Sequence, residues 1–107
     1  MIKITQRAQK QLIYILQKKN LSNHHIRVGA RGKKNCALNY YLGIQKEPLP
    51  GDNQYQIGEI NIIMDSMSAS RMKEVELDYI DLSKHSGFVF RRNSNQDNII
   101  SGNSVFE

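Results

Sequence analysis

The segment Ile26-Arg27-Val28-Gly29-Ala30-Arg31 decides the fold that we expect for this chain. Every second residue from Ile26 to Ala30 is apolar, which is the period-two pattern of a β-strand with one buried face. A loop of glycine, lysine and asparagine follows and contains Cys36, the single cysteine. The apolar and aromatic segment 38–45 then resumes the strand pattern. The sequence therefore predicts two strands joined by a loop that carries the one thiol.

Helix and strand patterns continue on both sides of this segment. Upstream, Thr5 is a suitable N-cap for a helix that runs to about Asn20, because apolar residues recur there every three or four positions. Downstream, Asp65 and Ser66 are suitable caps for a short helix at about 68–73. Further strands are predicted at 2–4, 55–57, 60–64, 77–80 and 87–90. The sum is a mixed, mainly β domain of about seven short strands with one N-terminal helix and one short helix.

Composition excludes several other classes. With 107 residues and 39% apolar content, the chain is expected to form a single domain over residues 1–107 with a small core. One cysteine excludes an internal disulfide framework and a self-sufficient four-cysteine metal site. No apolar run approaches the length of a membrane span and no signal region is seen, so we expect a cytoplasmic or cytosol-like organelle compartment. The polar composition after Arg91 predicts a mobile tail at about 96–107.

The charge of the chain is distributed unevenly. The formal net charge is +5, but residues 1–46 contain ten basic residues and no acid, so all ten acids lie between residues 47 and 107. Because strands from the two halves are expected to pair in one domain, part of this charge can be neutralised internally. The basic excess is therefore weak evidence for a nucleic-acid partner.

Blocks along nearly the whole chain resemble, in order and approximate spacing, the A-type iron–sulfur carrier proteins, which have the HesB-like fold. The resemblance implies a compact β-sandwich or barrel-like domain. The blocks that carry it are Ile26-Arg27-Val28-Gly29-Ala30-Arg31, the loop with Cys36, Tyr41-Leu42, Glu47-Pro48-x-Pro50-x-Asp52, Met64-Asp65, Leu77-Asp78-Tyr79, Gly87-Phe88-x-Phe90, Asn93-x-Asn95 and Ser101-Gly102-Asn103-Ser104.

The resemblance also implies a cofactor and partners. In that family, a cysteine in the loop after a Leu-Arg-Leu-Gly strand and two more in a Cys-Gly-Cys-Gly tail hold iron or an iron–sulfur cluster, usually between subunits. Cys36 matches the first position, whereas Ile99-Ile100-Ser101-Gly102 stands where the tail ligands would be. The chain thus resembles a degenerate member that lacks the C-terminal motif. The implied partners are a homodimer or higher oligomer and iron–sulfur assembly proteins or apo-protein clients.

The number of thiolate ligands limits how strongly this chain can bind iron. Thiolates hold iron in such clusters, and the hydroxyl of Ser101 is far less acidic than a thiol. The resemblance implies a role in iron–sulfur protein maturation. Because the tail cysteines are missing, we expect weak or partner-assisted ligation of a cluster or iron through Cys36. No nucleophile stands with a base and no glycine loop is suited to phosphate, so we expect no enzymatic activity.

Alternatives remain open for function. Cys36 has two possible roles. Its cationic neighbours favour the thiolate, which would make it a metal ligand or a reactive thiol; alternatively it is inert. The chain is alternatively a cofactor-free paralogue that acts as a protein-interaction or regulatory module. A weaker alternative is a basic nucleic-acid-binding domain, although no recognised motif supports it. The basic residues on which these alternatives depend are Arg27, Arg31, Lys33 and Lys34.

Other polar residues are expected to lie at the surface. His24 and His25 are adjacent and would point to opposite faces of an extended chain, and His85 has no partner at ligand spacing. Asp78 and Asp81 resemble paired carboxylates for acid–base chemistry, but no catalytic constellation of histidine, serine or lysine accompanies them in the sequence. We therefore predict surface positions for the histidines and solvated strand positions for both aspartates.

Overall fold

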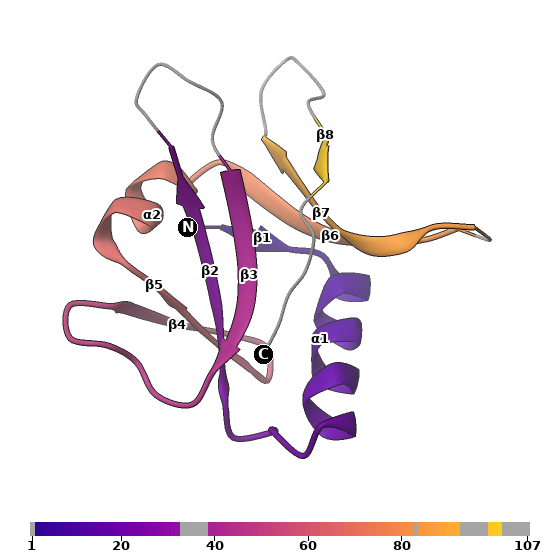
Figure 1. Cartoon of the computed structure of the whole chain (residues 1–107), viewed down its shortest axis with the longest axis horizontal. Helices are drawn as coiled ribbons and strands as arrows, with labels where there is room; N and C mark the ends of the chain where they lie inside the picture. The colour runs from indigo at the N-terminus through magenta and orange to yellow at the C-terminus, as the bar shows by residue number, and fades with distance from the viewer. Residues whose placement is uncertain (1, 33–38, 83, 93–98, 102–107) are drawn as a thin grey trace.

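The structure is a computed structural model that describes residues 2–32, 39–82, 84–92 and 99–101, and these residues form two four-stranded sheets and two helices (Figure 1). The predicted mixed, mainly β class is confirmed, with two open sheets among the described residues. In chain order the elements are β1 (Lys3–Ile4), α1 (Gln6–Lys18), β2 (His25–Arg31), β3 (Asn39–Gln45), β4 (Asn53–Ile57), β5 (Ile60–Met64), α2 (Ser66–Arg71), β6 (Val75–Asp81), β7 (Ser86–Arg92) and β8 (Ile99–Ser101).

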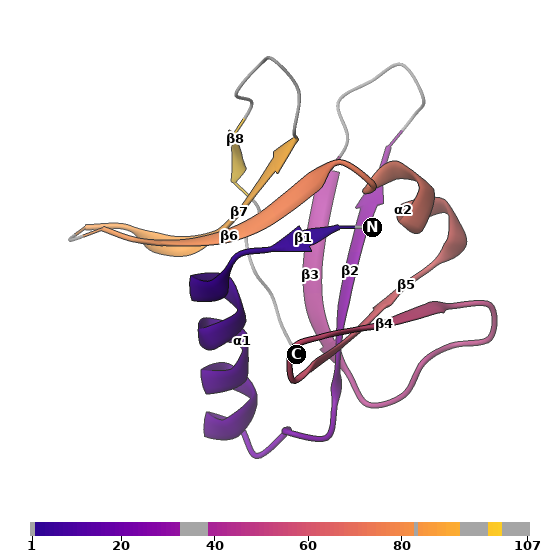
Figure 2. The ribbon, with the colours of Figure 1, turned by 180° about the vertical axis from the view of Figure 1, so that it is seen from behind.

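The two sheets have different strand orders. The first has the order β3-β2-β5-β4, in which β2 pairs antiparallel with β3 and parallel with β5, and β4 and β5 form a hairpin. The second has the order β1-β6-β7-β8, in which only the β1–β6 pair is parallel. Figures 1 and 2 show that the β6–β7 hairpin runs across the direction of β2 and β3 and extends past the start of α1.

Buried apolar side chains join α1 to both sheets in one cluster. α1 contributes the stripe that its sequence predicts, with Ala8, Leu12 and Leu16 buried. The rings of Tyr40 in β3 and Phe90 in β7 stack with their centroids 5.1 Å apart. Because these rings come from different sheets, their contact ties the two layers together.

Local sequence signals set the ends of the helices. The Thr5 hydroxyl accepts a hydrogen bond from the Ala8 amide at 3.2 Å and caps α1, as the sequence predicts. The Asp65 carboxylate accepts from the Ser68 amide at 2.8 Å and caps α2, which begins two residues earlier than predicted. Gly58, at a φ of 59°, occupies the tight turn between β4 and β5, where a left-handed backbone favours glycine.

One strand lies in the segment for which the sequence predicts a mobile tail. Residues Ile99–Ser101 form β8, which pairs antiparallel with β7. The other residues of the predicted tail lie outside the described part of the chain. The strand went unpredicted because the segment is short and its sequence neighbours are polar.

Asp78 is buried, and the prediction of a solvated position for it is wrong. Its carboxylate accepts hydrogen bonds from Thr5 Oγ1 at 2.6 Å, from Arg7 Nε at 2.7 Å and Nη2 at 2.6 Å, and from Arg91 Nη1 at 2.5 Å. The Tyr79 amide also donates to it at 2.8 Å. Hydrogen bonds from Arg7 outweigh the cost of burial and hold the pKa of Asp78 far below its ordinary value. Asp81 is exposed, as expected.

Replacing Asp78 with asparagine is expected to destabilise the fold. Asp78→Asn keeps the shape but removes the charge that its arginine partners require, at a cost of about 1–3 kcal/mol. Urea unfolding of the wild type, Asp78→Asn and the control Asp81→Asn measures this. Asp81 lies on the same strand but is exposed, so its variant should unfold near the wild-type midpoint. Equal midpoints for all three proteins would contradict the assigned role of Asp78.

The stabilisation by Asp78 is expected to depend on pH. Since the folded-state pKa of Asp78 is lowered, its contribution is fully present above the unfolded-state pKa of about 3.9 and is lost as pH falls below it. The difference in free energy of unfolding between the wild type and Asp78→Asn should therefore shrink below about pH 4. Unfolding curves measured at pH 7 and at successively lower pH test this. A difference that stays constant or grows in acid would contradict it.

Candidate functional site

The connection between β2 and β3 contains Cys36, the one residue that the sequence assigns to a cofactor or metal. Cys36 lies outside the described residues, but the strands on both sides of this connection are defined. β2 and β3 pair in register from His25 opposite Gln45 to Arg31 opposite Asn39. Arg31 and Asn39 therefore mark the end of the hairpin at which the connection leaves and returns.

Arg27 does not belong to the cationic surroundings predicted for Cys36. It lies four residues before Arg31, which is about 13 Å along an extended strand. Its guanidinium forms an ion pair with Asp52 and donates to Gln45 Oε1 at 2.8 Å. A hydrogen bond from Arg27 lowers the pKa of Asp52. This contact neutralises one charge of the basic half with one from the acidic half, as the charge distribution predicts.

Tyr41 covers the outer face of the hairpin beside the cysteine connection. A Cβ atom at Gly29, its register partner, would overlap the tyrosine ring. The Arg31 guanidinium lies over that ring, 4.7 Å from its centroid. The Tyr41 hydroxyl donates to Asp65 at 3.2 Å. Glycine is thus required at position 29 because the aromatic ring occupies the space of a side chain.

Near the end of β2, side chains of α2 provide the hydrogen bonds that a neighbouring strand would otherwise provide. β5 pairs with β2 only at Ile26 and Arg27, so the backbone of Ala30 needs other partners. The Ser68 hydroxyl accepts from the Ala30 amide at 3.1 Å, and Arg71 Nη1 donates to the Ala30 carbonyl at 3.4 Å. α2 therefore supplies hydrogen-bond partners to the last part of β2.

Asp65 links α2 to this hairpin as a carboxylate. Burial acts to raise its pKa, but hydrogen bonds from the Ser68 amide and hydroxyl and from Tyr41 outweigh burial and lower it. The same carboxylate thus caps the helix and positions the tyrosine that covers Gly29. The helix cap was predictable from the sequence, whereas the contact between Asp65 and Tyr41 was not.

Adding a methyl group at Gly29 is expected to displace Tyr41. Gly29→Ala should lower the free energy of unfolding by about 1–3 kcal/mol, because the ring must move. Gly43→Ala, on the neighbouring strand β3, is the matched control, since a Cβ there would meet nothing within 4 Å. Thermal or urea unfolding measures both. Similar effects from the two substitutions would contradict the proposed constraint at Gly29.

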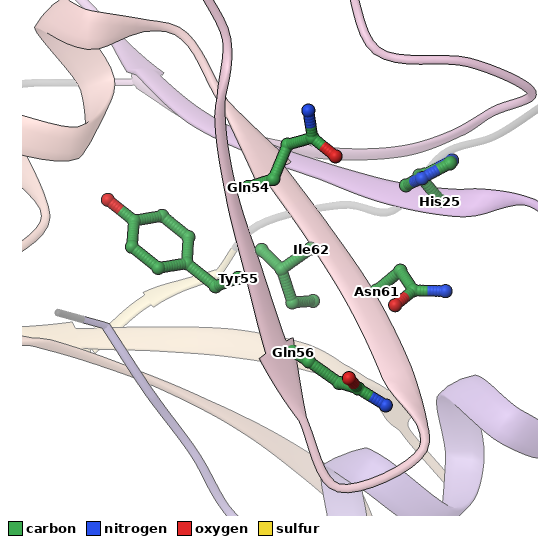
Figure 3. Close-up of a pocket in the computed structure, with 6 residues that line it drawn as sticks. All are labelled: His25, Gln54, Tyr55, Gln56, Asn61 and Ile62. Carbon is green, nitrogen blue, oxygen red and sulfur yellow. The ribbon is translucent and has the colours of Figure 1, made fainter.

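A shallow hollow on the first sheet carries polar side chains and one of the predicted surface histidines. Figure 3 shows His25 of β2 near Asn61 of β5, with Gln54 and Gln56 from β4. His25 Nδ1 lies 3.0 Å from the Lys46 carbonyl oxygen. His24 Nδ1 lies within hydrogen-bonding distance of Asn23 Oδ1, at 3.0 Å, and His85 is exposed. The described residues contain no group of three or more His, Cys, Asp or Glu side chains that could hold a metal.

The donor set of the chain does not fit a self-sufficient iron–sulfur site. The sequence contains a single cysteine, whereas such clusters are ordinarily held by four thiolates or by thiolates with histidines. Where the resembled family has tail cysteines, this chain has β8, whose residues Ile99 to Ser101 pair through the backbone with Arg91 to Val89. One chain therefore offers one thiolate and no second one.

Comparisons with known proteins identify the fold. No protein-family model matches the chain. The uncharacterized protein slr1565 of Synechocystis sp. is 27% identical over 90 residues, which cover 84% of this chain and 80% of that protein. The chain also resembles the crystal structure of IscA with a 2Fe–2S cluster, with a TM-score of 0.71 and 22% identity over 87% of this chain and 86% of that one.

Two further solved structures agree with this assignment. Escherichia coli SufA, which is involved in biosynthesis of iron–sulfur clusters, gives a TM-score of 0.69 with 15% identity over 85% of this chain and 84% of that one. A protein from Aquifex aeolicus solved by NMR gives 0.67 with 22% identity over 85% and 90% of the two chains. This chain therefore has the fold of the A-type iron–sulfur carriers. None of the helices in the described residues is long and apolar enough to cross a membrane.

Proposed function

We propose that this protein takes part in iron–sulfur protein maturation as a carrier-type protein. Thiols from outside the chain complete the ligand set of its cargo. The single observation that supports this most strongly is the likeness to IscA and SufA, which extends over at least 85% of the chain. Cys36 lies between β2 and β3, where the sequence resemblance places the first ligand. The role is one of binding and transfer, without enzymatic catalysis.

The cargo on this proposal is an iron–sulfur cluster or iron held in part by Cys36. One chain supplies one thiolate and a homodimer supplies two, because the sequence has a single cysteine. The remaining ligands come from small thiols or from an assembly or client protein. Ligation of this kind is weak and exchangeable, which suits transfer better than storage.

Anaerobic reconstitution with iron, sulfide and a small thiol tests the proposal. Visible absorption of the protein after removal of free reagents should show thiolate-to-iron bands for the wild type and none for Cys36→Ser. Omitting the small thiol should reduce the wild-type bands strongly. Equal bands in the wild type and Cys36→Ser would exclude Cys36 as a ligand, and no bands in either protein would exclude cluster carriage.

The single cysteine favours one second candidate, a cofactor-free interaction module on the same scaffold. A pull-down under reducing, metal-free conditions separates the two functions. A partner retained equally by the wild type and Cys36→Ala favours the interaction module. A partner retained only by iron-loaded wild-type protein favours the carrier.

A further inference from the structure

The six arginines of the chain fall into two groups of three. Arg7 and Arg91 bind Asp78, and Arg27 binds Asp52. The other three are Arg31, Arg71 and Arg92, which form no ion pair with a carboxylate in the described part of the chain. Since the first three are neutralised by buried or half-buried acids, the second group holds the arginine charge that no carboxylate of the described residues neutralises.

All three arginines of the second group lie around the end of the β2–β3 hairpin; we call them the arginine patch. Arg31 is the last residue of β2. Arg71 binds the carbonyl of Ala30, and Arg92 Nη2 donates to the hydroxyl of Tyr40 at 2.9 Å. Ala30 and Tyr40 face each other in register. Three different elements, β2, α2 and β7, therefore bring their arginines to one end of the molecule.

The contacts of the arginine patch orient its guanidinium groups without neutralising them. Arg71 and Arg92 each use one nitrogen on a neutral oxygen, and Arg31 lies over the ring of Tyr41. Arg31 and Arg92 are exposed and Arg71 is half-buried. Lys73 and Glu74, in the turn after α2, carry opposite charges and leave the local balance positive. A guanidinium held in this way keeps donors for an incoming acidic group.

We propose that the arginine patch docks an acidic segment of a partner protein. Carboxylates match the planar fork of each guanidinium. An acidic segment that passes over the end of the hairpin can contact Arg31 on the face of Tyr41 and Arg92 on the face of Tyr40. Nucleic acid is the less suitable occupant, because the arginines beyond this end are paired with acids and do not continue a cationic track. This deepens the proposed function, on which it rests, by naming the chemistry of the partner that approaches the Cys36 connection.

Binding of a labelled octaglutamate peptide to the metal-free protein in reducing, low-salt buffer tests the patch. Fluorescence anisotropy should show that Arg31→Gln and Arg92→Gln each weaken peptide binding by about tenfold. Glutamine retains a donor for the Tyr40 hydroxyl, and circular dichroism checks that each variant is folded. The matched control is Lys10→Gln, an equal change of charge at an exposed position on α1, which lies away from the end of β2 (Figure 1). It should change the affinity by less than about threefold.

Each outcome of this experiment decides for or against the patch. Equal weakening by Lys10→Gln and the patch variants would show that only net charge matters and would overturn the proposal. Undetectable binding of octaglutamate by the wild type would also overturn it. Tighter, arginine-dependent binding of a labelled octathymidylate would assign the surface to nucleic acid instead. The readout uses no iron, so loss of cluster binding in reconstitution leaves it unaffected, and its failure leaves the carrier test intact.

Discussion

The buried carboxylate of Asp78 is the interaction on which the arrangement of the second sheet depends. It accepts hydrogen bonds from Thr5 and Arg7 at the start of α1 and from Arg91 in β7, while lying in β6 itself. One charge therefore holds the start of α1 against the β6–β7 hairpin, although Arg7 and Asp78 lie 71 residues apart in sequence. Because Thr5 also caps α1, the same contact fixes the position at which the helix leaves β1 and begins to cover the core.

Much of the fold follows from local patterns, but the ionic contacts do not. Alternating apolar residues predicted β2, β5, β6 and β7, and the α1 stripe predicted its buried face. Nothing in the period-two pattern of β6 distinguishes Asp78 from Asp81, because burial depends on α1 and β7 packing around one of them. One signal was available: Arg7 stands in the first turn of a helix, where the helix dipole disfavours a cation, and it therefore required an acid from elsewhere.

The candidate site was predictable to a smaller extent. Sequence spacing located Cys36 between two strands and predicted that charges of the basic and acidic halves would neutralise one another, as Arg27 and Asp52 do. It could not show that Arg71 and Arg92, both in the acidic half, reach the end of the β2–β3 hairpin. Charge counted along the chain therefore missed two of the cations at this end, which α2 and β7 contribute.

We propose that this chain, which has a single cysteine, binds its cargo only together with ligands from outside the chain. Native mass spectrometry of the reconstituted protein tests this most directly, because it weighs every component of the loaded species. Each cluster-bearing species is expected to contain this chain together with added thiol or a second protein. A cluster-bearing species composed of this chain alone, whether monomer or homo-oligomer, would contradict it.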